Sequence, residues 1–254
     1  MNLSKESKNF LENLRLYLVS SGKKEQEIEE IIEELEDHLL EAEKNGKSTE
    51  SISGKTPKEY MSQLADDMPL DLKGLMKYIP ILFLGAFAYL LAGDALRGDM
   101  SYSLLKLAGF PLIFLFHLLF TAVSFKYMAS HTLSKIQEWI LFGIIGTVPI
   151  VLFIALLFAD KAYETPAFHF GKTGTGTAAV LSILIFIGLA IWAKMWMPIV
   201  LPAVLYVPEL IIDATPLQES VKLMVTALLV PLCAAGCLIL FWNKEKKKGA
   251  IAEK

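Results

Sequence analysis

The sequence predicts an all-α protein with a small soluble head (residues 1–75), a polytopic membrane domain (76–242) and a basic tail (243–254). Three observations support this fold class. The 254 residues are 54% hydrophobic, which is too apolar for an ordinary soluble domain. Several apolar runs after residue 76 reach the length that spans a bilayer as a helix. Charge is uneven, because residues 1–77 carry 17 Asp and Glu against 11 Lys and Arg, whereas the remainder carries 10 against 13.

The head is expected to be a bundle of three short amphipathic helices. The first covers about Lys5 to Val19, and Gly22 is placed to end it. The third begins at Thr56-Pro57, where Thr56 caps the helix and Glu59 closes a capping box. A bundle of about 70 residues is near the lower limit of independent stability. We therefore expect a partner or the membrane domain to stabilise it.

The second helix, within residues 23–47, is the most strongly patterned stretch. Apolar residues recur at three- and four-residue steps and line one face, carboxylates cover the other faces, and Asn45-Gly46 ends the helix. The candidate residues of the head core or of a partner-binding surface are Ile28, Ile31, Leu35, Leu39 and His38. His38 is expected to be solvated or at the core edge rather than a metal ligand.

The run EELEDHLLEAEKNGKS, followed by TPKEYMSQLADDM, resembles the HAAS domain, a helix-turn-helix-associated alpha-helical signalling domain of Gram-positive bacteria. The resemblance covers residues 1 to about 70. Family members often carry Gly-Asp-Pro before the third helix, whereas this chain has Gly54-Lys55-Thr56-Pro57 and keeps a capping residue there. The resemblance implies a cytoplasmic interaction module, commonly followed by transmembrane helices and often encoded near PadR-type repressors, without a known catalytic residue.

Six membrane spans are expected, and the fifth is short. The ranges are 78–95, 104–125, 139–158, 177–196, 197–212 and 221–242. By length alone, residues 177–212 are too long for one span and short for two. At ~1.5 Å per residue the fifth span reaches only about 24 Å, so it must thin the bilayer, borrow flanking residues or be partly re-entrant.

Charge decides in favour of six spans. The tail carries Lys244, Lys246, Lys247 and Lys248 and is expected to stay in the cytoplasm with the head. An even number of spans follows, with a tight inner turn near Lys194 to Pro198. We expect a multi-pass cell-membrane protein with both termini in the cytoplasm. Charges interrupt residues 3–20, so no cleaved signal peptide is expected.

His117 is the one intramembrane polar candidate, near the middle of the second span. A polar ring at that depth is costly unless paired. Two readings are open for His117. In the first it relays protons or contacts a ligand, and in the second it makes an interhelical hydrogen bond. The hydrogen-bond reading is favoured, and the lack of another ionisable residue at matching depth weakens the relay reading. Prolines in or beside the spans favour kinks, which shape packing and in some transporters line a substrate path: Pro111, Pro149, Pro198, Pro202, Pro208 and Pro231.

Other motifs indicate no chemistry. Gly171-Lys172-Thr173 lacks the earlier glycine of a phosphate loop, because that position is Pro166, and it is expected to be a flexible loop. Cys233 and Cys237 bracket small residues, which favours helix packing over metal or redox chemistry. We expect no catalytic, cofactor-binding or metal site, no cofactor and no enzymatic activity. An intramembrane enzyme is the weakest of three readings.

Two function classes stay open. In the first, the chain is a membrane regulatory or signalling protein whose head binds a cytoplasmic protein, with a PadR-type regulator suggested by the family resemblance. In the second, it is a small permease or a membrane subunit of an export system with a regulatory head. The expected partners are the lipid bilayer and a cytoplasmic protein. Direct nucleic-acid binding is not expected, because the head is acidic. The sequence does not specify an oligomeric state.

Overall fold

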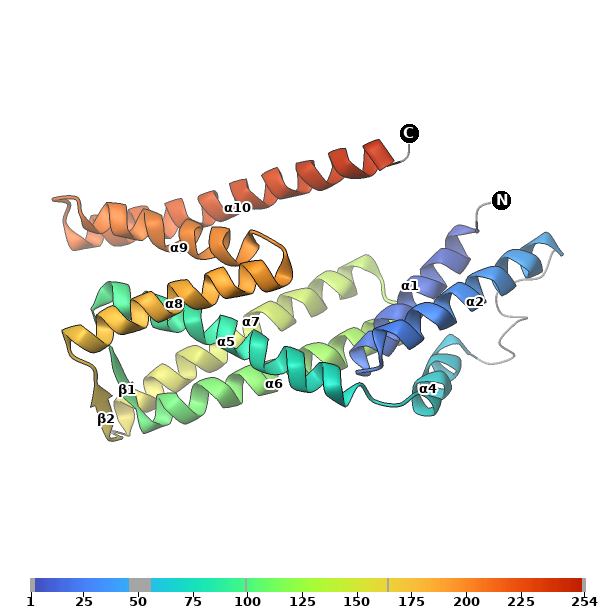
Figure 1. The fold of residues 1–254 in the computed structure, drawn as a ribbon, viewed down its shortest axis with the longest axis horizontal. Coiled ribbons are helices and arrows are strands. Elements are labelled where there is room, and N and C mark those ends of the chain that lie inside the picture. The colour runs from blue at the N-terminus through green and yellow to red at the C-terminus, as the bar shows by residue number, and fades with distance from the viewer. Residues whose placement is uncertain (1–2, 46–55, 99, 164, 253–254) are drawn as a thin grey trace. The chain divides into compact units, whose positions relative to one another are not determined.

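The computed structural model describes residues 3–45, 56–98, 100–163 and 165–252, and almost all of them are helical (Figure 1). The expected loop from Ser48 to Lys55 and Gly46 lie outside the described residues. The described elements are α1 (Lys5–Ser20), α2 (Glu25–Lys44), α4 (Pro57–Asp67), α5 (Leu72–Arg97), β1 (Ser101–Ser103), α6 (Leu104–Ser130), α7 (Lys135–Ala162), β2 (Ala167–His169), α8 (Lys172–Ala193), α9 (Met197–Asp213) and α10 (Glu219–Ala252).

The chain forms two compact units. One contains Met1–Pro80 and Tyr102–Ala167, and the other contains Ile81–Ser101 and Phe168–Lys254. The division differs from the expected boundary near residue 75, because the head groups with α6 and α7. It falls within α5 at Pro80, an internal proline that removes one helical hydrogen bond. Two short strands, β1 and β2, pair as a two-stranded sheet that the sequence analysis did not anticipate.

Local signals in the sequence set the ends of the head helices. The Ser4 hydroxyl caps α1 by accepting from the Ser7 N–H at 3.2 Å. Gly22 has φ +69° and follows the end of α1, as expected. At the start of α4, the Thr56 side chain accepts from the Glu59 N–H, and the Glu59 carboxylate accepts from the Thr56 N–H. The predicted capping box is therefore present.

The head core lies between α1, α2, α4 and the last turns of α6. Leu14 and Leu18 of α1 are fully buried there with Ile28 of α2 and Met61 of α4. Ala129 of α6 belongs to the same buried cluster. Helix α6 therefore supplies a fourth helix to the bundle, which answers the expectation that a body of this size needs additional support.

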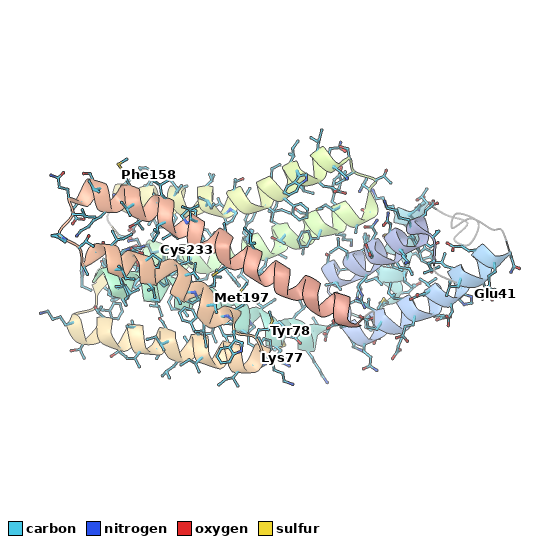
Figure 2. The ribbon with its side chains drawn as sticks, turned by 90° about the horizontal axis from the view of Figure 1, so that it is seen from above. Glu41, Lys77, Tyr78, Phe158, Met197 and Cys233 are labelled. Carbon is cyan, nitrogen blue, oxygen red and sulfur yellow. The ribbon has the colours of Figure 1, made fainter. Side chains whose placement is uncertain are left out.

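Helices α6 and α7 pack against one another as a hairpin in the first unit. At the end of the hairpin remote from the head, Lys106 pairs with Asp160 at 3.2 Å, and Ser103 hydrogen-bonds to the same carboxylate. Most apolar side chains of α7 are exposed, as Phe158 is at 70% (Figure 2). Apolar side chains without protein cover on a helix of 28 residues are typical of a lipid-facing surface.

In the second unit, α8 ends and α9 begins at a tight turn. Lys194 adopts the left-handed conformation with φ 51°, and the Met195 N–H donates to the Ala190 carbonyl at 3.1 Å. The expected turn near Lys194 to Pro198 is present, so residues 177–212 form parts of two helices. Helix α9 packs on both α8 and α10.

Five described helices are long and apolar enough to cross a membrane: α5, α6, α7, α8 and the Glu219–Cys237 part of α10. With 17 residues, α9 is about 26 Å long at ~1.5 Å per residue, less than the hydrocarbon thickness of about 30 Å. Pro202 and Pro208 lie inside it.

One expectation about a helix limit needs correction. The segment that begins at Gly171 is not a flexible loop, because α8 starts at Lys172. The Thr175 and Thr177 hydroxyls bond back to carbonyls four residues earlier, at 3.3 and 2.9 Å, and this satisfies polar groups of the first turns. Helix α10 extends to Ala252 and so includes most of the residues assigned to the basic tail.

Candidate functional site

The predicted apolar stripe of α2 faces the interior of the head. Ile28 and Leu39 are 1% and 2% exposed. Ile31 and Leu35 are half-buried and pack against the same clusters. His38 is exposed and lies 3.7 Å from Glu34. The four apolar candidates are therefore placed in the head core.

The outward face of α2 is acidic. Its exposed carboxylates recur at helical spacing along nearly the whole helix: Glu30, Glu33, Glu34, Asp37 and Glu41. Glu41 lies near the end of α2 that points away from α6 and α7 (Figure 2). Helix α1, rather than α2, packs along α6. The acidic face of α2 is therefore exposed to solvent and accessible to a soluble partner protein.

The junction between the head and α6 combines apolar and cationic contacts. The Lys126 ammonium lies 4.8 Å from the centre of the Tyr17 ring, a cation–π geometry. Tyr17 is itself buried in the head core, as is Ala129 one turn further along α6. The last turns of α6 thus hold the head through α1, beyond the expected end of the span at residue 125.

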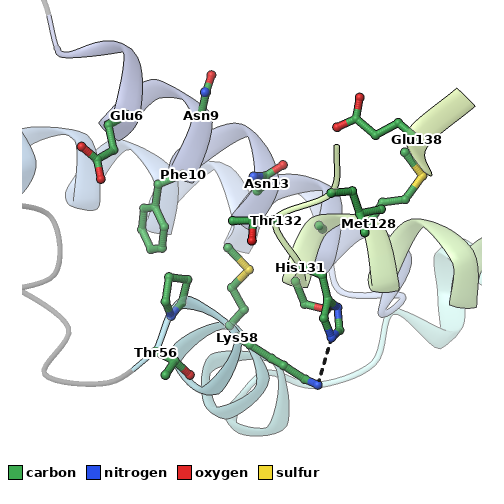
Figure 3. A pocket seen from close by; sticks show the side chains of 15 residues that line it. Glu6, Asn9, Phe10, Asn13, Thr56, Lys58, Met128, His131, Thr132 and Glu138 are labelled. Carbon is green, nitrogen blue, oxygen red and sulfur yellow. Dashed lines mark hydrogen bonds between the residues drawn. The ribbon is translucent and has the colours of Figure 1, made fainter. Parts of the chain in front are cut away.

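A cavity of about 630 Å³ lies at the same junction. Helix α1 contributes Glu6, Asn9 and Asn13, and α7 contributes Glu138. Figure 3 shows Glu6 and Glu138 on opposite sides of this cavity. Phe10, Met61, Met128 and Ala129 supply apolar lining. Helices α1, α4, α6 and α7 therefore all contribute to the border of the cavity.

One hydrogen bond crosses the cavity from α4 to the end of α6. The Lys58 Nζ lies 3.3 Å from the His131 Nε2, as the dashed line in Figure 3 marks. An ammonium can only donate, so Nε2 accepts. The other ring nitrogen, Nδ1, lies 2.9 Å from the Tyr127 carbonyl and 3.0 Å from the Ser130 hydroxyl. This geometry lets Nδ1 donate to the Tyr127 carbonyl.

His117 is partly buried on α6, as its position in the span suggests. Its Nδ1 is a buried atom without a hydrogen-bond partner among the described residues, and so is the Thr121 hydroxyl one turn later. Within the described part of the chain, Nδ1 therefore makes no interhelical hydrogen bond. Cys233 and Cys237 are free, half-buried thiols on α10.

The second unit has its own polar contacts between α5 and α9. The Tyr206 hydroxyl donates to the Tyr89 carbonyl at 2.6 Å. The Arg97 guanidinium pairs with the Glu209 carboxylate at 2.9 Å, one helical turn from the tyrosine. Tyr89 also packs on Phe186 of α8, with ring centres 4.9 Å apart. These contacts join three helices, and among the described residues no group of three His, Cys, Asp or Glu side chains is arranged to hold a metal ion.

Sequence reasoning did not identify Lys58, Lys126 and His131 as site residues. Neither His131 nor Lys126 belongs to a motif in the sequence. The position of Lys126 directly after an apolar run was a usable signal, because such lysines lie at the bilayer surface. The pairing of Lys58 with a residue 73 positions away had no local signal.

A family model described as the HAAS transmembrane region matches residues 88–204. This match begins after the head, so it is independent of the resemblance carried by residues 1 to about 70. No curated protein and no solved structure matches the chain. The match agrees with the five apolar helices of membrane-spanning length. The match therefore supports a HAAS-type membrane protein, with similarity to the HAAS transmembrane region over residues 88–204.

Proposed function

We propose that the protein is a non-catalytic membrane regulator whose head binds a cytoplasmic protein. Both termini lie in the cytoplasm, and the bound protein is a transcription regulator of the PadR type. A change in the packing of the membrane helices moves the last turns of α6, and this movement changes how the head helices pack on α6. In thermodynamic terms the membrane signal shifts the population of two head arrangements, only one of which binds the partner.

The observation that carries the proposal is the participation of α6 in the head core. One continuous helix from Leu104 to Ser130 contains an apolar run of membrane-spanning length and ends with Ala129 buried among head residues. A rigid helix of this kind couples displacement in the membrane to displacement of the residues packed on it. The Lys58–His131 bond and the cavity beside it lie at the same junction, where a shift of α6 changes the contacts of α4.

The acidic face of α2 favours a partner with a basic surface. Carboxylates at helical spacing attract and orient such a surface and raise the association rate. A regulator that binds nucleic acid carries a basic surface of this kind. Binding to the head would then compete with binding to DNA, because both ligands are negatively charged.

Co-purification from the native host tests the proposal. The tagged full-length protein is compared with a Glu33→Lys/Asp37→Lys variant, which reverses charge on the outer face of α2. The matched control, Glu12→Lys/Asp67→Lys, makes the same change in charge at exposed sites of α1 and α4. We expect a DNA-binding regulator to co-purify with the wild type and the control but not with the α2 variant.

Transcript measurements provide the second readout. Deletion of the gene is expected to change expression of the genes that the captured regulator controls, and the α2 variant is expected to reproduce the deletion. A reproducible absence of any regulator, together with unchanged transcription on deletion, would contradict the proposal.

A second candidate function, a small permease or export subunit, is favoured by His117. Its buried Nδ1 and the Thr121 hydroxyl lack hydrogen-bond partners in the described part of the chain, and ionisable groups at such depth mark substrate or proton paths in many transporters. Prolines inside α5, α6, α7, α9 and α10 add broken backbone hydrogen bonds. Unchanged transport and resistance phenotypes in His117→Phe and His117→Ala variants would remove this support.

A further inference from the structure

A second hollow at the junction, separate from the cavity beside His131, lies on the membrane side of the head. This groove has a volume of about 370 Å³ and is lined by residues of the head and of α6. Its lining includes the polar residues Lys23, Lys126, Ser21 and Asp66 and the apolar residues Leu119 and Val123, which belong with Lys126 to α6. The groove therefore has both charged and apolar lining residues, and it lies where α6 leaves its apolar segment.

The lining includes two lysines whose ammonium groups have no ion-pair partner in the described part of the chain. Lys23 donates to the Met68 carbonyl at 2.7 Å, and Lys126 lies over the Tyr17 ring. Both partners are uncharged, so neither lysine charge is neutralised. With Asp66 as the one carboxylate among the lining residues, the groove carries a net charge of about +1 at neutral pH.

The apolar lining residues belong to the lipid-facing surface of α6. Leu119 and Val123 are 69% and 66% exposed on a helix of membrane-spanning length, so acyl chains rather than water contact them. Beside the lysines, the Ser21 hydroxyl oxygen is buried and has no hydrogen-bond partner among the described residues. The lining of the groove therefore includes a hydroxyl with an unsatisfied hydrogen-bonding capacity.

We propose that this groove binds one anionic phospholipid of the head-side leaflet. The phosphate lies between the Lys23 and Lys126 ammonium groups and accepts from the Ser21 hydroxyl, and an acyl chain lies along Leu119 and Val123. Asp66 accepts hydrogen bonds from hydroxyl groups of the headgroup, as in phosphatidylglycerol. The bound lipid joins the head to α6, and this role goes beyond partner binding and does not depend on it.

Native mass spectrometry of the full-length protein tests lipid binding directly. The protein is extracted in detergent and incubated separately with phosphatidylglycerol, phosphatidylethanolamine and phosphatidylcholine. We expect selective retention of one phosphatidylglycerol by the wild type. A lysine near an anionic lipid surface contributes about 1 kcal/mol, so Lys23→Gln and Lys126→Gln are each expected to lower retention about fivefold.

The matched control is Lys135→Gln, which removes an exposed lysine at the head-side start of α7 outside the groove. Lys126→Arg keeps both the charge and the contact with Tyr17 and is expected to retain the lipid. The two lysine variants differ in their expected effect on folding. Lys126→Gln removes the contact with Tyr17 and could disturb the bundle, whereas Lys23→Gln keeps a donor for the Met68 carbonyl, so the head of the Lys23→Gln variant is expected to stay folded. Equal retention of zwitterionic lipids, equal loss in Lys135→Gln, or full displacement by inorganic phosphate would each overturn the proposal.

Discussion

The head and the second unit bury different side chains, although both are helical. The head buries Leu14, Leu18 and Met61 completely, and its exposed residues are mostly charged. The buried cluster of the second unit consists of Ala88, Ala92 and Phe186, while large apolar side chains cover its surface. The two regions are therefore built for different solvents.

This difference in buried side chains indicates which interactions stabilise each region. In water, burial of apolar surface provides the main driving force, about 25 cal/mol per Å². In lipid this force between helices disappears, and close approach of small residues and interhelical hydrogen bonds replace it. Ala88 and Ala92, together with the Tyr206–Tyr89 bond, match the second case. An exposed apolar side chain is thus unfavourable in the head, where it contacts water, and favourable in the second unit, where it contacts lipid.

The largest expected effect comes from charges placed in the head core. In a Leu35→Asp/Leu39→Asp variant, one carboxylate replaces a side chain that is 2% exposed and the other replaces a half-buried one. Burial of an unpaired charge costs several kcal/mol, which is comparable with the whole stability of a small domain. The head is expected to unfold and lose partner binding, whereas the protein still inserts into the membrane.

Limited proteolysis of membrane fractions measures this outcome, with cleavage expected in the head and the fragment that begins at α5 left intact. The conservative pair Leu35→Met/Leu39→Met serves as the control, because it keeps the apolar volume. Loss of the protein from the membrane fraction would show that the head and the membrane helices fold as one unit.

The next prediction compares two apolar side chains that are about equally exposed, one to water on the head and the other to lipid on a membrane helix. Val19 of the head is 53% exposed and Ile183 of α8 is 57% exposed. In the head, Val19→Asp faces water and is expected to change stability by about 0.5 kcal/mol or less. In the middle of a membrane helix, Ile183→Asp is expected to cost about 2.5–3.5 kcal/mol of insertion free energy. A glycosylation-based insertion assay of α8 and thermal unfolding of the full chain measure the two values, and equal effects would contradict the comparison.

A moderate effect is expected at the junction, where the two types of environment meet. Ala129→Trp forces a large side chain between α6 and the head, and such overpacking typically costs 1–3 kcal/mol. Protease sensitivity of the head is expected to rise. Leu112→Trp on the same helix is 65% exposed and provides the control, with no expected change. An unchanged head in Ala129→Trp would show that α6 does not support the bundle.

Signals within a few residues of one another allowed much of the fold to be predicted. Thr56 and Glu59 specify a capping box, Gly22 ends a helix, and the stripe through Ile28 and Leu39 specifies a buried face. Each depends on backbone geometry or helical period, which a short stretch determines by itself. The helix break at Lys194 was accessible for a related reason, since span length and charge required a turn there.

The candidate site depends on contacts between distant segments, and the sequence contains no local signal for them. The apolar run of α6 indicates a membrane span, but nothing in Ala129 indicates that it packs against Leu14 and Leu18 of the head. The Lys58–His131 bond likewise joins residues from separate helices. Small or polar residues of this kind fit many surroundings, so only the tertiary arrangement determines their partners.

The smallest expected effect concerns the start of α1, where Glu43 of α2 joins the two head helices. The Ser7 hydroxyl donates to its carboxylate at 2.6 Å, and the Ser4 N–H donates at 3.1 Å. These hydrogen bonds stabilise the charged form and hold the pKa of Glu43 below its usual value. The stabilisation is therefore complete above the unfolded-state pKa of about 4.3 and is lost as the pH falls through the lower folded-state pKa.

Hydrogen exchange of the first turns of α1, compared between wild type and Glu43→Gln at each pH, isolates this contribution. Protection in the wild type is expected to exceed that in the variant at neutral pH, and the difference is expected to shrink on acidification below the usual glutamate pKa. Ser7→Ala removes one of the donors and is expected to give an intermediate difference. Glu41→Gln, an exposed neighbour, is the matched control and is expected to follow the wild type. A difference in protection that grows on acidification would contradict this prediction. A folded-state pKa of Glu43 below the unfolded-state value means that the folded head is stabilised by the ionised carboxylate and loses this stabilisation when the carboxylate is protonated.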